Sequence, residues 1–259
     1  MRALFTAATG MKAQQLKVDT IANNLANVNT TGFKRGSAQF EDLYYQKVRT
    51  GNGATQQGTT ANDTVEVGNG ARASQVRREF IQGSFQTTGS QTDMAINGKG
   101  FFAVVNAEGD ELYTRNGNFS IDGQGTLVLP NGMALAEGIT IPADATQVDI
   151  DPDGIVSAVV AGEATQVGQV QLRTFVNPAG LDALGGGLFR ATEGSGVAQA
   201  GVPGTAGVGE INGGYLEMSN VDVADELIQM IQAQRAYELT GKVIEASDEM
   251  LQTTNQLKR

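Results

Sequence analysis

The sequence predicts an α+β fold, in which long N- and C-terminal helices pair as a coiled coil and a β-rich domain lies between them. Three observations predict it. Apolar residues recur every seven positions at both ends of the chain, as in a coiled-coil seam. The middle of the chain repeats a strand, turn, strand pattern. Glycine makes up 34 of the 259 residues, about twice its usual share.

The N-terminal helix is predicted from two rows of residues spaced by seven. The first row consists of Leu4, Met11, Val18 and Leu25. The second row, three residues further on, consists of Ala7, Gln14, Ile21 and Val28. Together they form the a and d positions of a seam with one polar member. Gly32 stands where a C-terminal cap belongs. We therefore expect a helix of about 28 residues, roughly 42 Å long.

The C-terminal helix, expected over residues 221–257, carries a matching pattern. One row consists of Val223, Met230, Tyr237, Ile244 and Leu251, and an adjacent row of Ala236, Val243, Met250 and Leu257. Residues 1–31 carry a net charge of +2 and residues 221–259 one of −3, which favours pairing of the two helices. Both helices are long for a compact domain. The narrow seams favour helices that pair with each other and with other copies. Helices that merely extend one globular core remain an alternative.

The middle of the chain reads as a series of hairpins. Strands are expected at residues 101–105 and 112–114, at 119–121 and 126–129, at 148–150 and 155–156, and at 172–176. Residues 50–64 contain no aliphatic side chain larger than alanine, and residues 194–214 contain eight glycines. Both stretches are expected to be extended or flexible connectors. We expect residues 46–69 to stay outside any compact core.

These patterns predict three domains. Residues 1–34 and 219–259 form the paired helices, residues 35–95 and 205–218 an extended connecting region, and residues 96–204 a β-rich domain.

Composition excludes several classes of function. The net charge of −10 argues against a nucleic-acid partner. The absence of Cys, His and Trp excludes thiolate nucleophiles, Cys/His zinc sites, Ser-His-Asp triads and disulfides. A glycosidase-like carboxylate pair stays open in principle, but nothing marks one pair among the acids. We expect a protein that is not an enzyme and has no cofactor.

Two motifs nearly match ligand sites. Residues 149–154 read DIDPDG and match the first half of a calcium loop, but Val160 stands where its bidentate glutamate belongs. We expect a hairpin turn there and no metal dependence. Gly98-Lys99-Gly100 lacks the strand-to-helix context of a phosphate loop.

The N-terminus carries no clear targeting signal. No apolar run approaches the roughly 20 residues of a membrane span. The first ten residues lack the apolar region of a secretory signal. A transit peptide is the weaker alternative, because Arg2, Lys12 and Lys17 all precede the first acid, Asp19.

Five segments carry a family resemblance. Residues 22–34 (ANNLANVNTTGFK) resemble the N-terminal signature of bacterial flagellar rod and hook proteins. Residues 216–222 (LEMSNVD) and 230–238 (MIQAQRAYE) are similar to the C-terminal signature of that family. Residues 95–102 (AINGKGFF) and 113–119 (YTRNGNF) resemble its central signature. The resemblance covers nearly the whole chain in the same order.

Within the family, the chain resembles the distal-rod branch. Residues 168–172 (GQVQL), residues 175–181 (FVNPAGL) and the polar segment after Tyr44-Tyr45 carry this likeness. A proximal-rod or hook-type axial subunit is the main alternative. A soluble β-domain binding protein with helical tails is a more remote one.

The resemblance implies a structural subunit that is exported by the flagellar type III apparatus without a cleaved signal. Copies would stack helically into a hollow drive shaft that runs from the periplasm to the outer membrane. The implied partners are further copies, proximal rod proteins, hook protein and the P-ring and L-ring bushing.

The N-terminal motif residues Asn23, Asn24, Asn27, Gly32 and Phe33 are therefore candidate assembly residues. Asparagine disfavours helix interiors, so its repetition calls for a reason. One reason is that the side-chain amides bond neighbouring subunits. The alternative is that the helix frays before Gly32. We also expect both terminal segments to be poorly ordered until neighbouring copies cover their seams.

Overall fold

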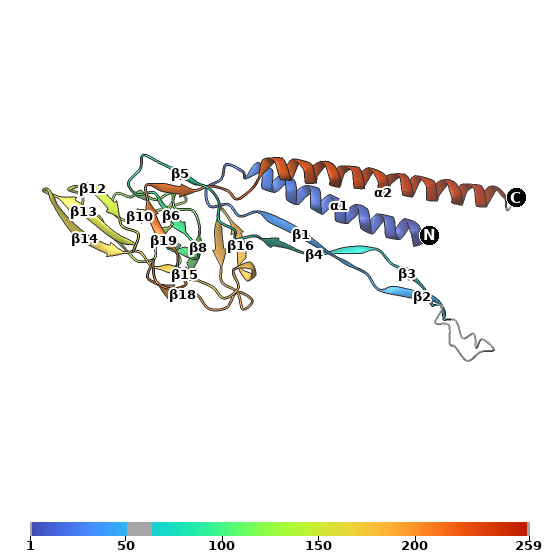
Figure 1. Ribbon diagram of the computed structural model, residues 1–259, viewed down its shortest axis with the longest axis horizontal. Helices are drawn as coiled ribbons and strands as arrows, with labels where there is room; N and C mark the ends of the chain where they lie inside the picture. The colour runs from blue at the N-terminus through green and yellow to red at the C-terminus, as the bar shows by residue number, and fades with distance from the viewer. Residues whose placement is uncertain (1, 51–63, 258–259) are drawn as a thin grey trace. The chain divides into compact units, whose positions relative to one another are not determined.

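The computed structural model describes residues 2–50 and 64–257 and confirms the α+β class. The described chain divides into two compact units, shown in Figure 1. The first unit comprises Met1–Leu25, Gly36–Arg77 and Val223–Arg259, and the second comprises Ala26–Arg35 and Arg78–Asp222. Each unit therefore draws on segments that lie far apart in the sequence.

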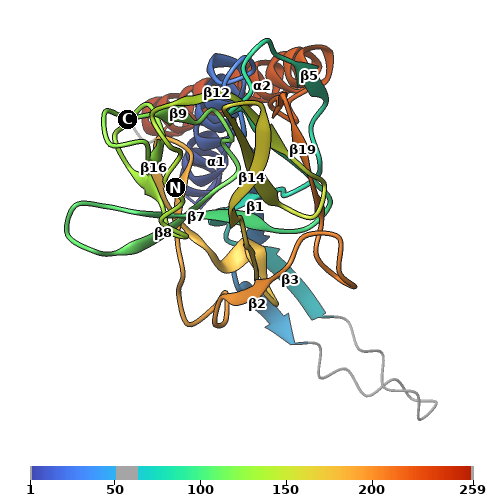
Figure 2. The same cartoon turned by 90° about the vertical axis from the view of Figure 1, so that its left-hand side faces the viewer.

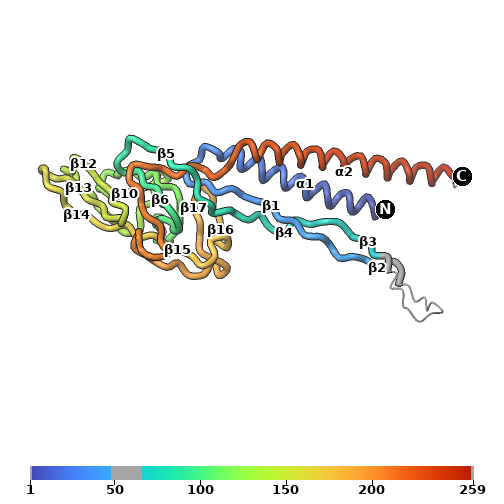
Figure 3. The backbone as a smooth tube through the Cα atoms, in the orientation of Figure 1, coloured from blue at the N-terminus to red at the C-terminus, as the bar shows by residue number. Residues whose placement is uncertain are grey.

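The first unit contains both long helices and two narrow strand pairs. The helices are α1 (Arg2–Ala26) and α2 (Val223–Leu257). The strands are β1 (Gly36–Asp42), β2 (Tyr45–Thr50), β3 (Thr64–Gly68) and β4 (Ala71–Arg78). Strand β1 pairs with β4, and β2 pairs with β3 in antiparallel register. The tube drawing in Figure 3 follows these strand pairs beside the helices.

Helices α1 and α2 are antiparallel neighbours within this unit (Figure 1). Near one end, the Asn24 Nδ2 group donates a hydrogen bond of 3.3 Å to Glu226 Oε2. Gly10 lies fourteen residues before Asn24 in α1, and Thr240 lies fourteen residues after Glu226 in α2. A Cβ atom on Gly10 would lie 3.9 Å from Cγ2 of Thr240. Equal steps in opposite directions fix one antiparallel register.

Helix α1 ends two residues before the predicted seam does. It stops at Ala26, and residues 27–32 form turns, so Val28 lies outside the helix. The Thr30 N–H donates to the Asn27 carbonyl, and Gly32 has a φ of 69°, in the left-handed region that favours glycine. The asparagine-rich sequence thus forms a turn two residues before the point where hydrophobic spacing alone predicts the helix to end.

The second unit consists mainly of strands. Its strands are β5 (Phe85–Thr87), β6 (Met94–Asn97), β7 (Phe101–Val105), β8 (Glu111–Thr114), β9 (Ser120–Ile121), β10 (Leu127–Val128), β11 (Ala134–Leu135), β12 (Ala145–Ile150), β13 (Ile155–Val160), β14 (Glu163–Gln169), β15 (Leu172–Thr174), β16 (Asp182–Gly185), β17 (Leu188–Arg190), β18 (Gln199–Gly201), β19 (Glu210–Gly213) and β20 (Tyr215–Glu217). A 3-10 turn, η1 (Pro178–Gly180), follows β15.

These strands form one large sheet and several small ones. The large sheet runs β16-β17-β8-β7-β11-β10-β9, with β15 also pairing with β7 and β18. Strands β12, β13 and β14 form a separate antiparallel meander, part of which faces the viewer in Figure 2. Strand β19 pairs with β6, and β20 pairs with β5. In these two pairings, the last two strands of the unit in sequence hydrogen-bond with its first two strands.

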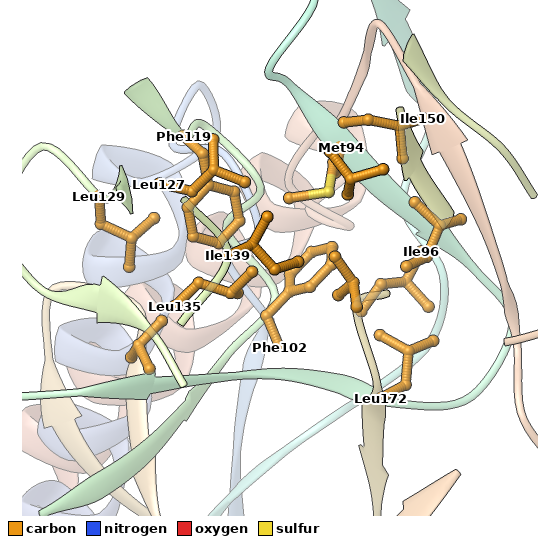
Figure 4. Packing of buried hydrophobic residues seen from close by; sticks show 14 of the residues in the cluster. Met94, Ile96, Phe102, Phe119, Leu127, Leu129, Leu135, Ile139, Ile150 and Leu172 are labelled. Atoms are coloured by element: carbon orange, nitrogen blue, oxygen red, sulfur yellow. The ribbon is translucent and has the colours of Figure 1, made fainter. Parts of the chain in front are cut away.

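The core of the second unit lies between these sheets. Phe102, Phe119 and Leu172 are among the buried side chains that converge there, as the close view in Figure 4 shows. A second cluster centres on Phe101, Ala103, Tyr113 and Phe189. Alternate residues of β7 therefore enter the two clusters, so this strand is buried on both faces.

The predicted hairpins are confirmed. Strands β7 and β8 pair around the turn at residues 106–109, and β9 and β10 pair around the turn at 122–125. Strands β12 and β13 flank the DIDPDG segment. In that segment the Gly154 N–H donates to the Asp151 carbonyl over 2.8 Å, and Gly154 has a φ of 77°. The calcium-like sequence is thus a tight hairpin turn.

The two glycine-rich stretches differ. Residues 194–214 combine turns with strands β18 and β19, which both pair within the second unit. Most of residues 50–64 lie outside the described part of the chain. The flanking strands β2 and β3 belong to the first unit.

Candidate assembly surfaces and the joint between the terminal motifs

The exposed surface of α2 carries a band of large apolar side chains. We call it the α2 apolar face, and it consists of Leu227, Ile228, Ile231, Leu239, Val243 and Met250. Their exposed fractions range from 43 % to 64 %. At 100° per residue, Leu227, Ile228 and Ile231 lie away from the buried Glu226 and Ala233, whereas Val243 and Met250 lie on the flank of the buried Ser247. Within one chain this apolar surface faces solvent.

The predicted C-terminal seam is divided between buried and exposed positions. Met230 and Ile244 are half-buried, whereas Val223, Tyr237 and Leu251 are between 38 % and 42 % exposed. The buried residues follow another row of the same heptad, three positions after the predicted row. That row contains small or polar side chains, and it includes Thr240, which approaches Gly10 of α1. The buried residues of α2 therefore do repeat every seven positions, but they are small or polar residues and not the large apolar ones.

The predicted N-terminal seam is better covered. Ala7 and Ile21 are buried, and the remaining members of the two rows, Leu4, Met11, Gln14, Val18, Leu25 and Val28, are half-buried. Phe5, outside both rows, is 64 % exposed. Helix α1 thus buries its seam residues within the chain to a greater extent than α2 does.

Asn24 joins three elements of the first unit. Its side chain is 1 % exposed. Its Nδ2 group donates to the Gly36 carbonyl and its Oδ1 atom accepts from the Gly36 N–H, each over 2.8 Å. With the 3.3 Å bond to Glu226, this amide connects α1, β1 and α2. Asn23 is exposed, and Asn27 Oδ1 accepts a hydrogen bond from Thr30 Oγ1. The asparagines of the motif therefore occupy different environments.

The terminal and central motifs meet within the second unit. The Gly32 N–H donates to the Glu217 carbonyl over 2.8 Å, and the Arg35 N–H donates to Asn220 Oδ1 over 2.8 Å. Thr31 Oγ1 donates to Asn116 Oδ1 over 3.0 Å. The motif at residues 22–34 thus contacts both the central and the C-terminal motifs. We call this contact region the motif joint.

Gly32 fits so closely in the motif joint that a larger residue would collide with the backbone. A Cβ atom at this position would lie 2.6 Å from the Arg115 carbonyl carbon and from the Asn116 nitrogen. Its positive φ is also unfavourable for any other L-residue. The neighbouring Phe33 is half-buried, and the Arg78 guanidinium lies 5.7 Å from the centre of its ring.

A buried ionic cluster holds the motif joint together. Lys34 Nζ lies 2.6 Å from Glu217 Oε1, and neither side chain is exposed. Arg115 approaches the other carboxylate oxygen at 3.3 Å. Lys34 also donates to the Ile81 carbonyl, and the Gly83 N–H donates to Glu217 over 3.0 Å. Two cations therefore share one carboxylate in a dry environment.

The charge state of this cluster reflects its burial. Burial lowers the pKa of the Lys34 ammonium below its ordinary value, although the adjacent Glu217 acts in the opposite direction. Burial also lowers the pKa of the Arg115 guanidinium. Arginine stays protonated regardless. The cluster is thus one in which a single missing partner leaves a buried charge uncompensated.

Sequence reasoning did not single out Lys34, Arg115, Glu217 or Glu226 as buried residues. Charged side chains are seldom fully buried unless they are paired. The available signal was their position inside otherwise apolar motif segments, such as Leu216-Glu217-Met218 and Phe33-Lys34. The identity of each partner depends on contacts between distant segments, which spacing along the chain does not reveal.

The described residues were compared with the requirements of a metal site and of a membrane-spanning helix. Across the residues that the structure describes, no group of three or more acidic side chains is placed to hold a metal ion. Neither described helix combines the length and apolar character needed to cross a bilayer. The features that stand out are the α2 apolar face and the motif joint, both suited to structural contacts.

Comparison with known proteins identifies the family. Three family models match the chain in order. "Flagella basal body rod protein" matches residues 4–34, "Flagellar hook protein FlgE/F/G D1 domain" residues 95–158, and "Flagellar basal body rod FlgEFG protein C-terminal" residues 212–257. The first and third models cover the N- and C-terminal motifs.

Individual relatives agree with these models over the full chain. The flagellar basal-body rod protein FlgG of Borreliella burgdorferi is 47 % identical over 100 % of this chain and 99 % of the relative. That of Caulobacter vibrioides is 45 % identical over 100 % of both chains. The flagellar hook protein FlgE of Treponema pallidum is 43 % identical, but over 51 % of this chain and 28 % of the hook protein. The chain belongs to the flagellar basal-body rod protein family.

Proposed function

We propose that this chain, a structural subunit of the bacterial flagellar basal-body rod and not an enzyme, builds the distal part of the rod. Copies stack helically into a hollow shaft that carries torque from the motor to the hook. Full-length similarity to rod proteins, against partial similarity to a hook protein, favours the rod over the hook.

The observation that carries this proposal is the α2 apolar face. Six large side chains that are about half exposed on one helix form an apolar surface of the kind that marks an interaction site. Covering the exposed half of each contributes roughly 1 kcal/mol. Several such contacts per copy, repeated along a tube, offset the entropy of ordering long helices. We infer that α1 and α2 pair as a coiled coil and line the inside of the tube.

The repeated contact must be heterologous to give a shaft. A contact between two different surfaces generates a ring or an open helix, and an open helix grows into a filament. The α2 apolar face on one copy would then meet another surface of the next copy. The N-terminal motif residues Asn23, Asn27 and Phe33, together with the exposed Phe5, are candidates for that second surface.

The family supports further partners and a location. We propose contacts with proximal rod proteins, with hook protein and with the P-ring and L-ring bushing. The shaft would run from the periplasm to the outer membrane, and the type III apparatus would export each subunit without a cleaved signal. Residues 1–34 and 219–259 would form the inner tube domain, residues 35–95 and 205–218 the connecting region, and residues 96–204 the outer domain.

One substitution on α2 tests the proposal. Ile231 is 50 % exposed, so Ile231→Asp should change monomer stability by no more than about 0.5 kcal/mol. It should nevertheless prevent tube formation, because a carboxylate would be buried between copies. Electron microscopy of the concentrated purified protein is the readout, with motility of complemented cells as a second one.

Ile231→Leu provides the matched control. It changes the same position but keeps a large apolar side chain there. The control should form tubes like the unchanged protein. If Ile231→Asp forms tubes at the same concentration as the unchanged protein, the α2 apolar face is not an assembly contact.

A further inference from the structure

The second unit contains a cavity that the rod function above does not account for. Its volume is about 350 Å³. Its apolar wall is made by Phe80, Phe101 and Phe175, whose rings pack edge to face. The Phe101 ring centre lies 5.4 Å from that of Phe80 and 5.7 Å from that of Phe175. The wall is therefore a preformed aromatic surface.

Two basic side chains, Lys99 and Arg115, also line this cavity. Residues 96–204 contain twelve acids and four bases, so half of the bases of this stretch lie at one cavity. Lys99 is exposed at its edge, whereas Arg115 is 4 % exposed. The cavity is thus a basic spot on a strongly acidic part of the chain.

The charge beside the cavity is incompletely balanced. Arg115 and Lys34 share the single carboxylate of Glu217, which leaves one excess positive charge in this contact cluster. The Arg115 Nε group is buried and has no hydrogen-bond partner among the described residues. A buried donor without a partner is destabilising, and so is a buried excess charge. A carboxylate in the cavity would offset the excess charge.

Exposed aliphatic side chains border the cavity. Val176, which lines it, is 83 % exposed, and so is Val197. The two loops that carry them adjoin, since a Cβ atom on Gly196 would lie 3.9 Å from Cβ of Val176. Two almost fully exposed valines beside an aromatic cavity extend the apolar surface available to a partner.

We propose that this cavity receives a carboxylate-bearing segment from a second copy of the same chain. The inference rests on the proposed function, which brings copies into repeated contact. Charge complementarity selects the occupant, because the surface of residues 96–204 is acidic outside this basic spot. The aromatic wall and the bordering valines contact the apolar neighbours of the entering carboxylate. The β-rich parts of adjacent copies are thereby locked together as well as their helices.

A charge reversal tests the proposal. Lys99→Glu should raise the concentration needed for half-maximal tube formation by about tenfold, because it repels the entering carboxylate. Arg190→Glu is the matched control, since Arg190 is an exposed base of the same acidic stretch and pairs with Asp182 at 2.9 Å. The control should change that concentration less than about twofold.

Cross-linking then identifies the occupant. The chain contains no cysteine, so Val176→Cys can carry a maleimide-linked benzophenone as a unique label. In assembled tubes, the label should cross-link to an acidic segment of another copy, as read by mass spectrometry of mixed light and heavy isotope-labelled protein. Ile121→Cys, an exposed apolar position of the same unit that does not line this cavity, is the control and should give a different cross-linked segment.

The outcomes distinguish failure of the cavity inference from failure of the rod function. If neither the variants nor the unchanged protein form tubes, the rod function is refuted. If tubes form equally well from Lys99→Glu, or if the Val176 label reacts within its own chain alone, the rod function stands and the cavity inference is overturned. Binding of free benzoate combined with unchanged assembly of Lys99→Glu would assign the cavity to a small carboxylate, which also overturns it.

Discussion

Replacing Glu217 by alanine should destabilise the second unit more than any other single change to an acidic residue there. The Glu217 carboxylate accepts hydrogen bonds from Lys34, the Gly83 N–H and Arg115. Its removal leaves two cations whose side chains are between 0 % and 5 % exposed. Lys34, whose side chain is fully buried, would then lie beside Arg115 without the carboxylate that the two share.

The expected magnitude follows from that burial. Removing one partner of a buried ion pair costs about 3–5 kcal/mol. For a unit of this size, each kcal/mol lowers the melting temperature by about 2–4 °C. Glu217→Ala should therefore lower the melting temperature of the second unit by about 6–20 °C. The same change at Glu210, an exposed acid on β19, should alter the free energy of unfolding by no more than about 0.5 kcal/mol.

Circular dichroism during thermal and urea unfolding of the purified chain provides the assay. The urea m-value should stay unchanged, which shows that the same surface is exposed on unfolding. The double variant Lys34→Met, Glu217→Ala should lose less than the sum of the two single changes, because the pair acts as one unit. A Glu217→Ala variant within about 1 kcal/mol of the unchanged protein would refute the view that this cluster holds the joint.

Three further measurements test other parts of the account. Burial raises the pKa of Glu137 above 4.5, so the folded chain holds that proton more tightly than the unfolded chain does. Its contribution to the free energy of unfolding should fall as pH rises from 4.5 through the raised pKa, and Glu137→Gln should flatten this dependence in urea titrations at successive pH values. Gly241→Ala should stabilise α2 by up to about 1 kcal/mol, because a Cβ atom there would meet nothing within 4 Å. Gly32→Ala should instead destabilise the motif joint, and thermal unfolding of the two variants compares these effects. Backbone amides of α2 should exchange hydrogen quickly in the monomer and slowly in tubes, and equal rates in both states would contradict ordering on assembly.

Local sequence patterns predicted the secondary structure well. The two helices and the hairpins depend on side-chain periodicity and on turn residues, which act over a few positions. The DIDPDG segment was assigned to a turn because Val160 cannot replace a bidentate carboxylate, and the turn is confirmed. The end of α1 was missed by two residues, because asparagine turns outweighed the hydrophobic period.

The candidate surfaces were harder to predict. Heptad spacing identified α2 as an amphipathic helix, but it could not tell which row faces α1 and which faces solvent. The buried row contains Glu226, Ala233 and Ser247, whose small or hydrogen-bonding side chains allow close approach. Large apolar residues are exposed in a lone chain. A hydrophobicity pattern predicts that all these apolar residues are buried, but it does not identify the surface that covers them.

The contacts of the motif joint could not be predicted from the sequence, for a different reason. Lys34 and Glu217 are 183 residues apart, and burial of either charge is favourable only if the other is present. The resemblance singled out the segments that contain them, but it did not show that these segments contact one another. Only the folded chain brings them together.

Electron cryomicroscopy of the concentrated protein would show whether copies of this chain assemble helically into a hollow shaft through their terminal helices. We expect tubes with α1 and α2 innermost and the α2 apolar face buried against neighbouring copies. Tubes in which Leu227, Ile231 and Val243 remain in contact with solvent, or a protein that stays monomeric at every concentration, would contradict this expectation.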